Sequence, residues 1–261
     1  MITLNKTLNV VVVAGASGIG RIIVESFVEQ SCEVMVCDVS RQHIQSFKRA
    51  FPKVTICETD VGQYDGVREF FDQVSKTMGH IDVLVNCAGI AGPTARMEDI
   101  EPDLWDQTIN ININGMFYCI KEAIPLLKQS NSPSIINLAS NAAFYGFPLR
   151  SPYTAAKWAT IGMTKTLAME LGDDGVRVNA ICPGSVSGQR IDRVIEADAK
   201  EQGKSIEAIK ASYVKQVSLK TFVEPEDVAH MCLYLASDMG RFISGQAIGL
   251  DGHTEGLSAN L

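Results

Sequence analysis

Two side chains in the middle of the chain have a spacing that suits acid–base chemistry. Tyr153 and Lys157 lie four residues apart on a helix predicted over 152–171, so both project from one face. A phenol with its ordinary pKa of about 10 is a poor catalyst at neutral pH, and an adjacent ammonium group lowers that pKa by favouring the phenolate. Such a pair arises by chance in many helices. Ser140, thirteen residues before Tyr153 at the end of a predicted strand, strengthens the interpretation.

A glycine-rich turn over residues 14–20 follows the first predicted strand and opens the first predicted helix. Its backbone amides lie at a helix N-terminus, where hydrogen bonds and the helix dipole both stabilise a pyrophosphate. Glycine-rich turns are common, so this turn gains weight only from its position between a strand and a helix. It predicts a dinucleotide site.

Asp38 ends the second predicted strand, 18 residues past Gly20. A carboxylate at this point hydrogen-bonds the hydroxyl groups of the adenosine ribose and repels the 2′-phosphate of NADP. Ser17 and Val39 occupy the nearest positions where an arginine or lysine would offset that repulsion. The sequence therefore predicts NAD as the cofactor. A role for Asp38 as a simple cap of the second helix is the alternative.

Apolar runs of four to seven residues alternate with segments of helical periodicity along the chain. The runs are nearly continuous in Val, Ile and Leu, which predicts an α/β fold with a parallel sheet covered by helices on both faces. The predicted strands are Val10–Ala14, Glu33–Cys37, Val54–Glu58, Val83–Asn86, Ser134–Ala139, Arg177–Ile181 and Ala247–Leu250. The predicted helices span 18–31, 40–50, 63–78, 103–129, 152–171 and 225–236.

The composition excludes several other classes of protein. A formal net charge of −7 without a basic run argues against nucleic-acid binding. The chain has no apolar stretch of membrane-spanning length, and its opening residues lack the pattern of a signal peptide. The seven cysteines are an odd number without a CxxC pair, and the four histidines lack ligand spacing. We expect buried thiols, a cytoplasmic location and no metal site.

The ordered set of motifs resembles the short-chain dehydrogenase/reductase family over essentially the whole chain. The matching residues are the turn 14–20, Asp38, Asp60-Val61, Asn86-Cys87-Ala88-Gly89, Asn112-Ile113-Asn114-Gly115, Ser140, Tyr153-Thr154-Ala155-Ala156-Lys157, Asn179-Ala180, Pro183-Gly184 and the ending 245–252. The resemblance implies a single doubly wound Rossmann domain over 1–261, with about seven parallel strands in the order 3-2-1-4-5-6-7. It also implies a homo-oligomer, either a dimer or a tetramer, built through the helices near 103–129 and 152–171.

The resemblance assigns a catalytic role to four residues. Tyr153 would take the alcohol proton as hydride leaves for the nicotinamide, and Lys157 would lower the pKa of that phenol and bind the nicotinamide ribose. Ser140 would hydrogen-bond and orient the substrate oxygen. Asn112 would hold a water that links Lys157 to bulk solvent. The residues that the resemblance assigns to cofactor binding are Gly15, Ser17, Gly18, Ile19, Gly20, Asp38, Asp60, Val61, Asn86, Ala88, Gly89, Tyr153, Lys157, Pro183, Gly184 and Val186.

Four positions depart from the family pattern. Val13 and Ala14 stand where the family usually has Thr and Gly, and because Ala tolerates little positive φ we expect Gly15 to take over the turn. Cys87 replaces the second Asn of the common Asn-Asn-Ala-Gly motif. Gly188 stands where many members have a Thr that contacts the cofactor, and Ser187 is the candidate to supply that hydroxyl.

The substrate is predicted least well. The long polar segment 185–222 follows the sixth strand and is expected to act as a lid, with a plain surface insertion as the alternative. Candidate pocket residues are Arg96, Asn141, Tyr145, Arg150, Arg190 and Arg193. The arginines suggest an anionic or polar substrate, unless each is an ordinary solvated surface residue.

Three functions fit these residues. The leading one is an NAD-dependent dehydrogenase that interconverts a small secondary alcohol and a ketone. An NADPH-dependent ketoreductase of the 3-oxoacyl type shares the same four catalytic residues, but Asp38 argues against it. A sensor that binds nucleotide without turnover is the third, and such proteins usually lose the Tyr or the Lys that this chain retains.

Overall fold

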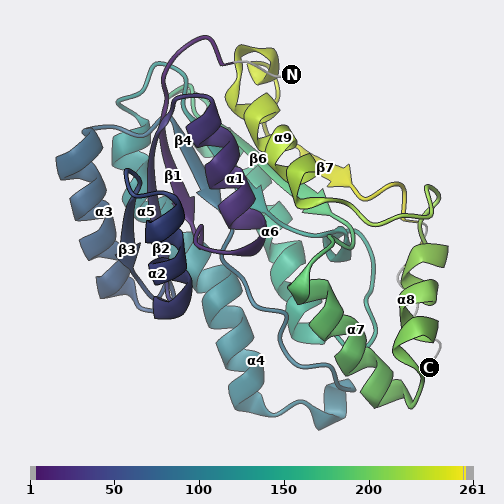
Figure 1. Cartoon of the computed structure of the whole chain (residues 1–261). Coiled ribbons are helices and arrows are strands. Elements are labelled where there is room, and N and C mark those ends of the chain that lie inside the picture. The colour runs from purple at the N-terminus through teal and green to yellow at the C-terminus, as the bar shows by residue number, and fades with distance from the viewer. Residues whose placement is uncertain (1–3, 255, 257–261) are drawn as a thin grey trace.

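The computed structural model describes residues 4–254 and Gly256, so the first three residues of the opening segment lie outside the described part. Its strands form one parallel sheet in the order β3-β2-β1-β4-β5-β6-β7, which confirms the predicted fold class (Figure 1). The strands are β1 (Asn9–Val13), β2 (Glu33–Asp38), β3 (Thr55–Glu58), β4 (Val83–Asn86), β5 (Ser134–Leu138), β6 (Arg177–Pro183) and β7 (Ala247–Leu250). Each predicted strand agrees with the observed one to within two residues at either end.

Helices cover both faces of this sheet. The longer ones are α1 (Gly18–Glu29), α2 (Arg41–Ala50), α3 (Tyr64–Met78), α4 (Pro102–Ile109), α5 (Gly115–Leu127), α6 (Ser151–Glu170), α7 (Gln189–Gln202), α8 (Ile206–Lys215) and α9 (Pro225–Ala236). Helices α1, α2 and α9 share one buried apolar cluster with the sheet. Helices α3 and α5 share a second cluster with the opposite face, and α6 packs against that cluster.

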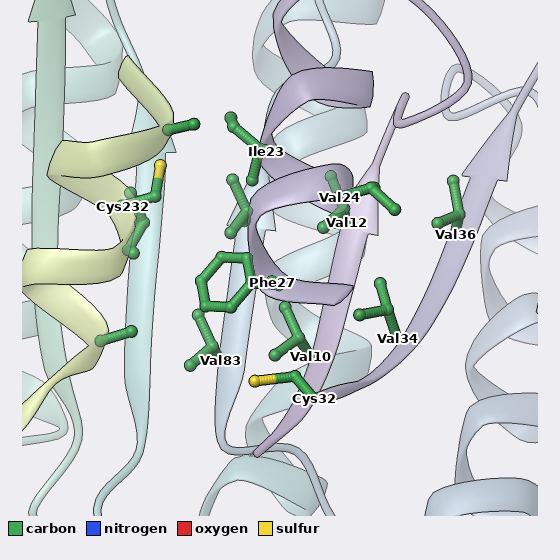
Figure 2. Packing of buried hydrophobic residues seen from close by; sticks show 14 of the residues in the cluster. Val10, Val12, Ile23, Val24, Phe27, Cys32, Val34, Val36, Val83 and Cys232 are labelled. Atoms are coloured by element: carbon green, nitrogen blue, oxygen red, sulfur yellow. The ribbon is translucent and has the colours of Figure 1, made fainter. Parts of the chain in front are cut away.

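The two faces of the sheet are buried because alternate residues of the same strand enter different clusters. Val10 and Val12 of β1 pack under α1, where Phe27 is fully buried, and Cys232 of α9 borders the same cluster (Figure 2). Val11, between them, belongs to the other cluster. This arrangement explains why the strands are apolar throughout instead of alternating with polar residues.

The structure differs from the sequence prediction in two segments. The single helix expected over 103–129 is divided into α4 and α5 by a π-helical turn, Asn110–Asn114. The segment 185–222 is not an irregular loop, because it contains α7 and α8. These two helices are held together by a small apolar cluster of Ile195, Ala199 and Ile209, and Figure 1 shows them in green as a pair beyond the sheet.

The parallel sheet collects the predicted site residues along one edge. Residues 14–20, Asp38 and Asn86 lie at or directly after the carboxyl ends of β1, β2 and β4. Ser140 and Pro183 lie at the same ends of β5 and β6. Ligands of open α/β sheets bind in the crevice at this edge, so the fold brings together residues that are distant in sequence.

Candidate active site

Tyr153 and Lys157 lie in the first two turns of α6, which begins at Ser151 with Pro152 in its first turn. A proline is favoured there because its missing N–H has no acceptor in the helix. Lys157 is buried, and its Nζ donates a hydrogen bond to the Leu138 carbonyl of β5 at 2.7 Å. The same Nζ lies 5.6 Å from the centre of the Tyr153 ring. The predicted pair is therefore close together in space and anchored to the sheet.

The charges around Tyr153 change its acidity. Burial on its own raises the pKa of a phenol, but the Lys157 ammonium, the Arg190 guanidinium and the hydrogen bond between Ser140 and the phenol outweigh it, and the pKa of Tyr153 is lowered. Burial lowers the pKa of Lys157 even though the phenol beside it acts in the opposite direction. A phenol that ionises more readily is a better proton acceptor near neutral pH.

Asn112 lies in the π-helical turn between α4 and α5, and π-helical turns are frequent at functional sites. Its side-chain oxygen accepts a hydrogen bond from the Ile90 amide at 2.8 Å, and its side-chain nitrogen donates to the Ile90 carbonyl at 3.0 Å. A Cβ added to Gly89 would lie 3.2 Å from the Asn112 oxygen and 3.7 Å from Lys157 Nζ. Asn112, Gly89 and Lys157 are therefore neighbours, and glycine leaves the space between them open.

Ser140 is buried at the carboxyl end of β5. Its hydroxyl accepts a hydrogen bond from the Ala142 amide at 3.2 Å, donates to Asn141 Oδ1 at 3.3 Å and also contacts the phenol of Tyr153. Ser140, Tyr153, Lys157 and Asn112 thus come together at one end of the sheet. The sequence predicted each of the four.

The glycine-rich turn corrects one expectation. Ala14 keeps the left-handed conformation at φ 58°, whereas Gly15 has no positive φ and does not take over the turn. Gly15 is needed for space instead, because an added Cβ would lie 2.7 Å from Val36. Gly20 allows α1 to approach the turn, since its added Cβ would lie 2.2 Å from the Ala14 carbonyl oxygen.

Because alanine is strained at positive φ, Ala14→Gly is expected to stabilise the protein. We expect the free energy of unfolding to rise by about 0.5–1 kcal/mol, measured by urea denaturation without added nucleotide. Ala16→Gly is the matched control in the same turn. Ala16 is buried and its φ is not positive, so its substitution should lower the stability. A loss of stability in Ala14→Gly would contradict this account of the turn.

The first turn of α1 is open for an anion. Helices leave their first amides without intrahelical acceptors, and the side chain of Ser17, the N-cap residue, does not bind them. Gly18 is exposed with φ 52°, and a Cβ there would meet no atom within 4 Å. Ile19 packs against the core beneath. These features fit a bound pyrophosphate.

Asp38 connects two segments that border the crevice. One carboxylate oxygen accepts from the Ala16 amide at 3.1 Å and the other from the Ser40 amide at 3.0 Å. The cap of α2 is Ser40, whose hydroxyl accepts from the His43 amide, so the structure does not support Asp38 as a simple helix cap. A carboxylate accepts about four hydrogen bonds, which leaves Asp38 capacity for a ligand.

The structure gives several other predicted cofactor residues side-chain partners within the protein. Asp60 binds the Gly62 amide through Oδ1, and the Val61 side chain is buried where it limits the space at Gly115. Asn86 donates to Asn137 of the neighbouring strand at 2.9 Å, and its own buried Oδ1 lacks a partner. Asn86 Oδ1 and the second carboxylate oxygen of Asp60 therefore keep capacity to bind a ligand, whereas Val61 could contact one only through its backbone or its apolar side chain.

The segment after β6 is held by Val223 and Glu224, which directly precede α9, and by Asp251, which follows β7. Gly184 is required where the chain passes Asp251, since an added Cβ would lie 2.9 Å from the Asp251 Cβ. Val186 forms an isolated parallel bridge with Val223. The Ser187 hydroxyl, our candidate to replace the missing Thr, donates to Glu224 at 2.9 Å. Ala88 and Pro183 lie on the same crevice edge, after β4 and at the end of β6.

The four arginines predicted to line the pocket differ in burial and in ion pairing. Arg96 is exposed and forms an ion pair with Glu98 at 2.8 Å, and Arg193 is exposed on α7. Arg150 is buried, with 4% of its surface exposed. Arg190 is exposed, but its charge reaches Tyr153.

The sequence analysis did not single out Thr254 near the chain end. Its hydroxyl accepts a hydrogen bond from Asn141 Nδ2 at 3.0 Å, and its carbonyl accepts from the Tyr145 hydroxyl at 2.8 Å. Asn137 was also missed, although it joins Asn86 of β4 to Thr164 of α6. The position of Asn137 inside an apolar strand is a signal that could have found it, because buried amides need partners.

Among the residues that the structure describes, no helix has both the length and the hydropathy needed to cross a membrane. Over the same residues, no group of three or more His, Cys, Asp or Glu side chains is arranged to hold a metal ion. All seven cysteines are free thiols, and five of them are buried.

Comparisons with known proteins agree with this geometry. The family model described as enoyl-(acyl carrier protein) reductase matches residues 13–254. The 3-oxoacyl-(acyl-carrier-protein) reductase FabG of Thermotoga maritima is 34% identical over 245 residues, which cover 92% of this chain and 95% of that protein. The 3alpha-hydroxysteroid dehydrogenase of Mediterraneibacter gnavus is 30% identical over 262 residues, which cover 97% of this chain and 98% of that protein.

Solved structures show the same fold. Aldohexose dehydrogenase of Thermoplasma acidophilum matches with a TM-score of 0.84 at 30% identity, over 98% of this chain and 96% of that one. An NAD⁺-bound xylitol dehydrogenase matches with a TM-score of 0.90 at 24% identity, over 94% of this chain and 98% of that one.

The chain belongs to the short-chain dehydrogenase/reductase family. It is an oxidoreductase of the type that interconverts alcohols and ketones with a nicotinamide cofactor on a Rossmann fold.

Proposed function

We propose that this chain is an NAD-dependent dehydrogenase that interconverts a secondary alcohol and its ketone. The observation that carries the proposal is the packing of the Lys157 ammonium against the Tyr153 phenol, with Ser140 hydrogen-bonded to that phenol. A phenol held beside a buried cation is suited to exchange a proton with an alcohol.

In this proposal each residue has a distinct task. A bound dinucleotide would supply the hydride acceptor for oxidation of the alcohol carbon and the hydride donor for reduction of the ketone. Tyr153 as phenolate takes the hydroxyl proton during oxidation, and as phenol it returns that proton during reduction. Ser140 donates a hydrogen bond to the substrate oxygen. Lys157 keeps the phenol acidic and, with Asn112 holding a water beside it, carries the proton toward solvent.

Residues along the carboxyl edge of the sheet fit the dinucleotide. The open first turn of α1 would bind the pyrophosphate, and Asp38 would bind the hydroxyl groups of the adenosine ribose. Asp60, Val61, Asn86, Ala88 and Gly89 would surround the adenine and its ribose. Pro183, Gly184 and Val186 would lie against the nicotinamide, and Lys157 would bind its ribose.

The preference for NAD rests on the charges around Asp38. Val39 is exposed beside it and carries no charge. The nearest arginine along the chain, Arg41, binds both oxygens of Glu58 through its Nε at 2.8 and 2.9 Å. A 2′-phosphate would therefore meet one carboxylate and one neutralised guanidinium, which disfavours NADP.

We expect kcat/KM for NAD to exceed that for NADP by about 100-fold or more. Asp38→Ala should lower the ratio of kcat/KM for NAD to that for NADP at least about tenfold. The change removes both the repulsion of the 2′-phosphate of NADP and a hydrogen bond to the ribose of NAD. Asp72→Ala, on the exposed face of α3, is the matched control and should leave the ratio unchanged. Steady-state assays with both nucleotides measure this directly.

A second candidate is an NADPH-dependent 3-oxoacyl-type ketoreductase. The 34% identity to the Thermotoga maritima reductase favours it. A strong preference of the unmodified protein for NADP would decide for this candidate and against our interpretation of Asp38.

Three further properties belong to the proposal. The free thiols support a reducing, cytoplasmic location. Helices α7 and α8 would close over the substrate as a lid. Assembly into a dimer or tetramer through α4, α5 and α6 is supported by apolar side chains that these helices expose. These side chains are Leu104, Phe117, Trp158 and Met169.

A further inference from the structure

A buried arginine stands next to the proposed acid–base residue. Arg150 is the N-cap residue of α6, three positions before Tyr153, and its charge is one of those that lower the pKa of that phenol. Only 4% of its surface is exposed, although arginine is rarely buried without a partner. Its Nη1 donates to the Thr94 hydroxyl at 2.7 Å, which fixes the guanidinium between α6 and the segment after β4.

The hydrogen bonds of this guanidinium are incomplete. Its buried Nε has no hydrogen-bond partner. In the described part of the chain, no carboxylate comes within ion-pair distance of Arg150, whereas Arg41 and Arg96 each pair with a glutamate at 2.8 Å. The other neighbour of Arg150 is the Phe147 ring, whose centre lies 5.8 Å from the guanidinium carbon. A buried cation with an unfilled donor is costly, and functional sites are where such costs are retained.

Asp198 of α7 is buried near residues 147–149, but it forms no ion pair with Arg150 and its Oδ1 has no hydrogen-bond partner. Asp198 of α7 accepts a hydrogen bond from the Tyr213 hydroxyl, and the Tyr213 ring lies against Phe147 with the ring centres 6.4 Å apart. A cavity of about 190 Å³ lies between residues 147–149 and the two lid helices. Leu149, the residue directly before Arg150, lines this cavity, so the cavity reaches the start of α6, where Arg150 and Tyr153 lie.

We propose that Arg150 binds the carboxylate of the substrate, and that the protein therefore acts on hydroxy acids and the corresponding keto acids. This inference rests on the proposed dehydrogenase function and names its substrate class. A guanidinium presents several N–H groups in a planar fork that matches a carboxylate. The substrate would supply the anion that Arg150 lacks, and the position of Arg150 beside Tyr153 would direct the hydroxyl carbon toward the phenol.

The test compares matched substrates. Each of a set of 2-, 3- and 4-hydroxy acids is assayed against its methyl ester and its primary amide, with NAD and with NADP. We expect kcat/KM for at least one acid to exceed that for its ester by about 30-fold or more. Arg150→Met should remove this preference, and Arg150→Lys should restore part of it. Arg49→Met, on the exposed face of α2, should leave the preference unchanged.

A binding measurement keeps the test independent of turnover. Butyrate and butyramide are titrated into the protein with NADH present, by calorimetry. Butyrate should bind, butyramide should not, and Arg150→Met should lose butyrate binding while NADH affinity is retained. Arg150→Met is first checked for an intact fold by circular dichroism. If the variant does not fold, two measurements on the unmodified protein test the inference. They are the ratio of kcat/KM for each acid to that for its ester, and the titration with butyrate.

The inference would be overturned if the unmodified protein had equal activity on acids and esters. It would also be overturned if a folded Arg150→Met variant that binds NADH lost activity on acids and on esters to the same extent. If neutral alcohols are oxidised and acids are not preferred, only the inference fails. If no alcohol or ketone of any class reacts with either nucleotide, the proposed dehydrogenase function itself fails.

Discussion

Tyr153→Phe is expected to lower kcat/KM for alcohol oxidation by about 10³-fold or more, because the variant has no group to take the hydroxyl proton. The ring and its packing are retained, so the dissociation constant of the dinucleotide should change by less than about threefold. Steady-state kinetics and a fluorescence titration with the reduced nucleotide measure the two quantities.

Tyr234→Phe, a change on the distant helix α9, is the matched control and should retain full activity. Comparable turnover in Tyr153→Phe and the unmodified protein would mean that another group is the base.

Lys157→Met should affect both turnover and binding. The ammonium is the first of the groups that lower the pKa of Tyr153. Without it the phenol ionises less readily, and the variant also loses a donor to the ribose. We expect kcat/KM to fall by about 10²–10³-fold and the dinucleotide to bind about tenfold more weakly. Lys165→Met, two turns further along α6 and exposed, serves as the control and should behave like the unmodified protein.

The dependence of kcat/KM on pH has a defined direction in the unmodified protein and should shift in the Lys157→Met variant. Oxidation requires the phenolate, so kcat/KM rises with pH and levels off above the pKa of Tyr153, which lies below its ordinary value of about 10. Reduction requires the phenol and shows the opposite trend. In Lys157→Met the midpoint should move to higher pH for both directions. An unchanged midpoint would show that Lys157 acts only through the cofactor.

The fold was largely predictable because its signals are local. Continuous apolar runs such as Val10–Val13 are typical of strands covered on both faces, and their alternation with helices predicts a parallel sheet. The edge of the sheet that holds the site was predictable as well, because the glycine-rich turn, Asp38, Asn86 and Ser140 each lie at or just after the carboxyl end of a strand. For this reason Ser140, Tyr153 and Lys157 were identified before their distances were known.

Helices α7 and α8 were not predicted, although the sequence contains a signal for α7. Ile191, Ile195 and Ala199 recur at intervals of four residues, which is the period of a helix. Polar residues dominate the rest of this segment, so its average composition resembles a loop. The stripe becomes meaningful only when Ile209 of α8 packs against it. Short amphipathic helices depend on such tertiary contacts.

Other features cannot be obtained from sequence patterns at all. In the π-helical turn, the Asn112 side chain hydrogen-bonds the backbone of Ile90, which lies 22 residues away in sequence. Ala14 adopts a conformation that its residue type disfavours, and the surrounding strand and helix impose it. Arg96 and Arg150 are alike in sequence, and only the structure distinguishes an ion-paired surface residue from a buried one.

The central claim is that Lys157 and its neighbours make the Tyr153 phenol unusually acidic. The most direct measurement is the ultraviolet absorbance of phenolate across pH, taken as the difference between the unmodified protein and Tyr153→Phe without added cofactor. We predict a single ionisation with a midpoint below that of an ordinary tyrosine, displaced upward when Lys157→Met is introduced into both proteins. A midpoint at or above the ordinary value in the unmodified protein would contradict the account.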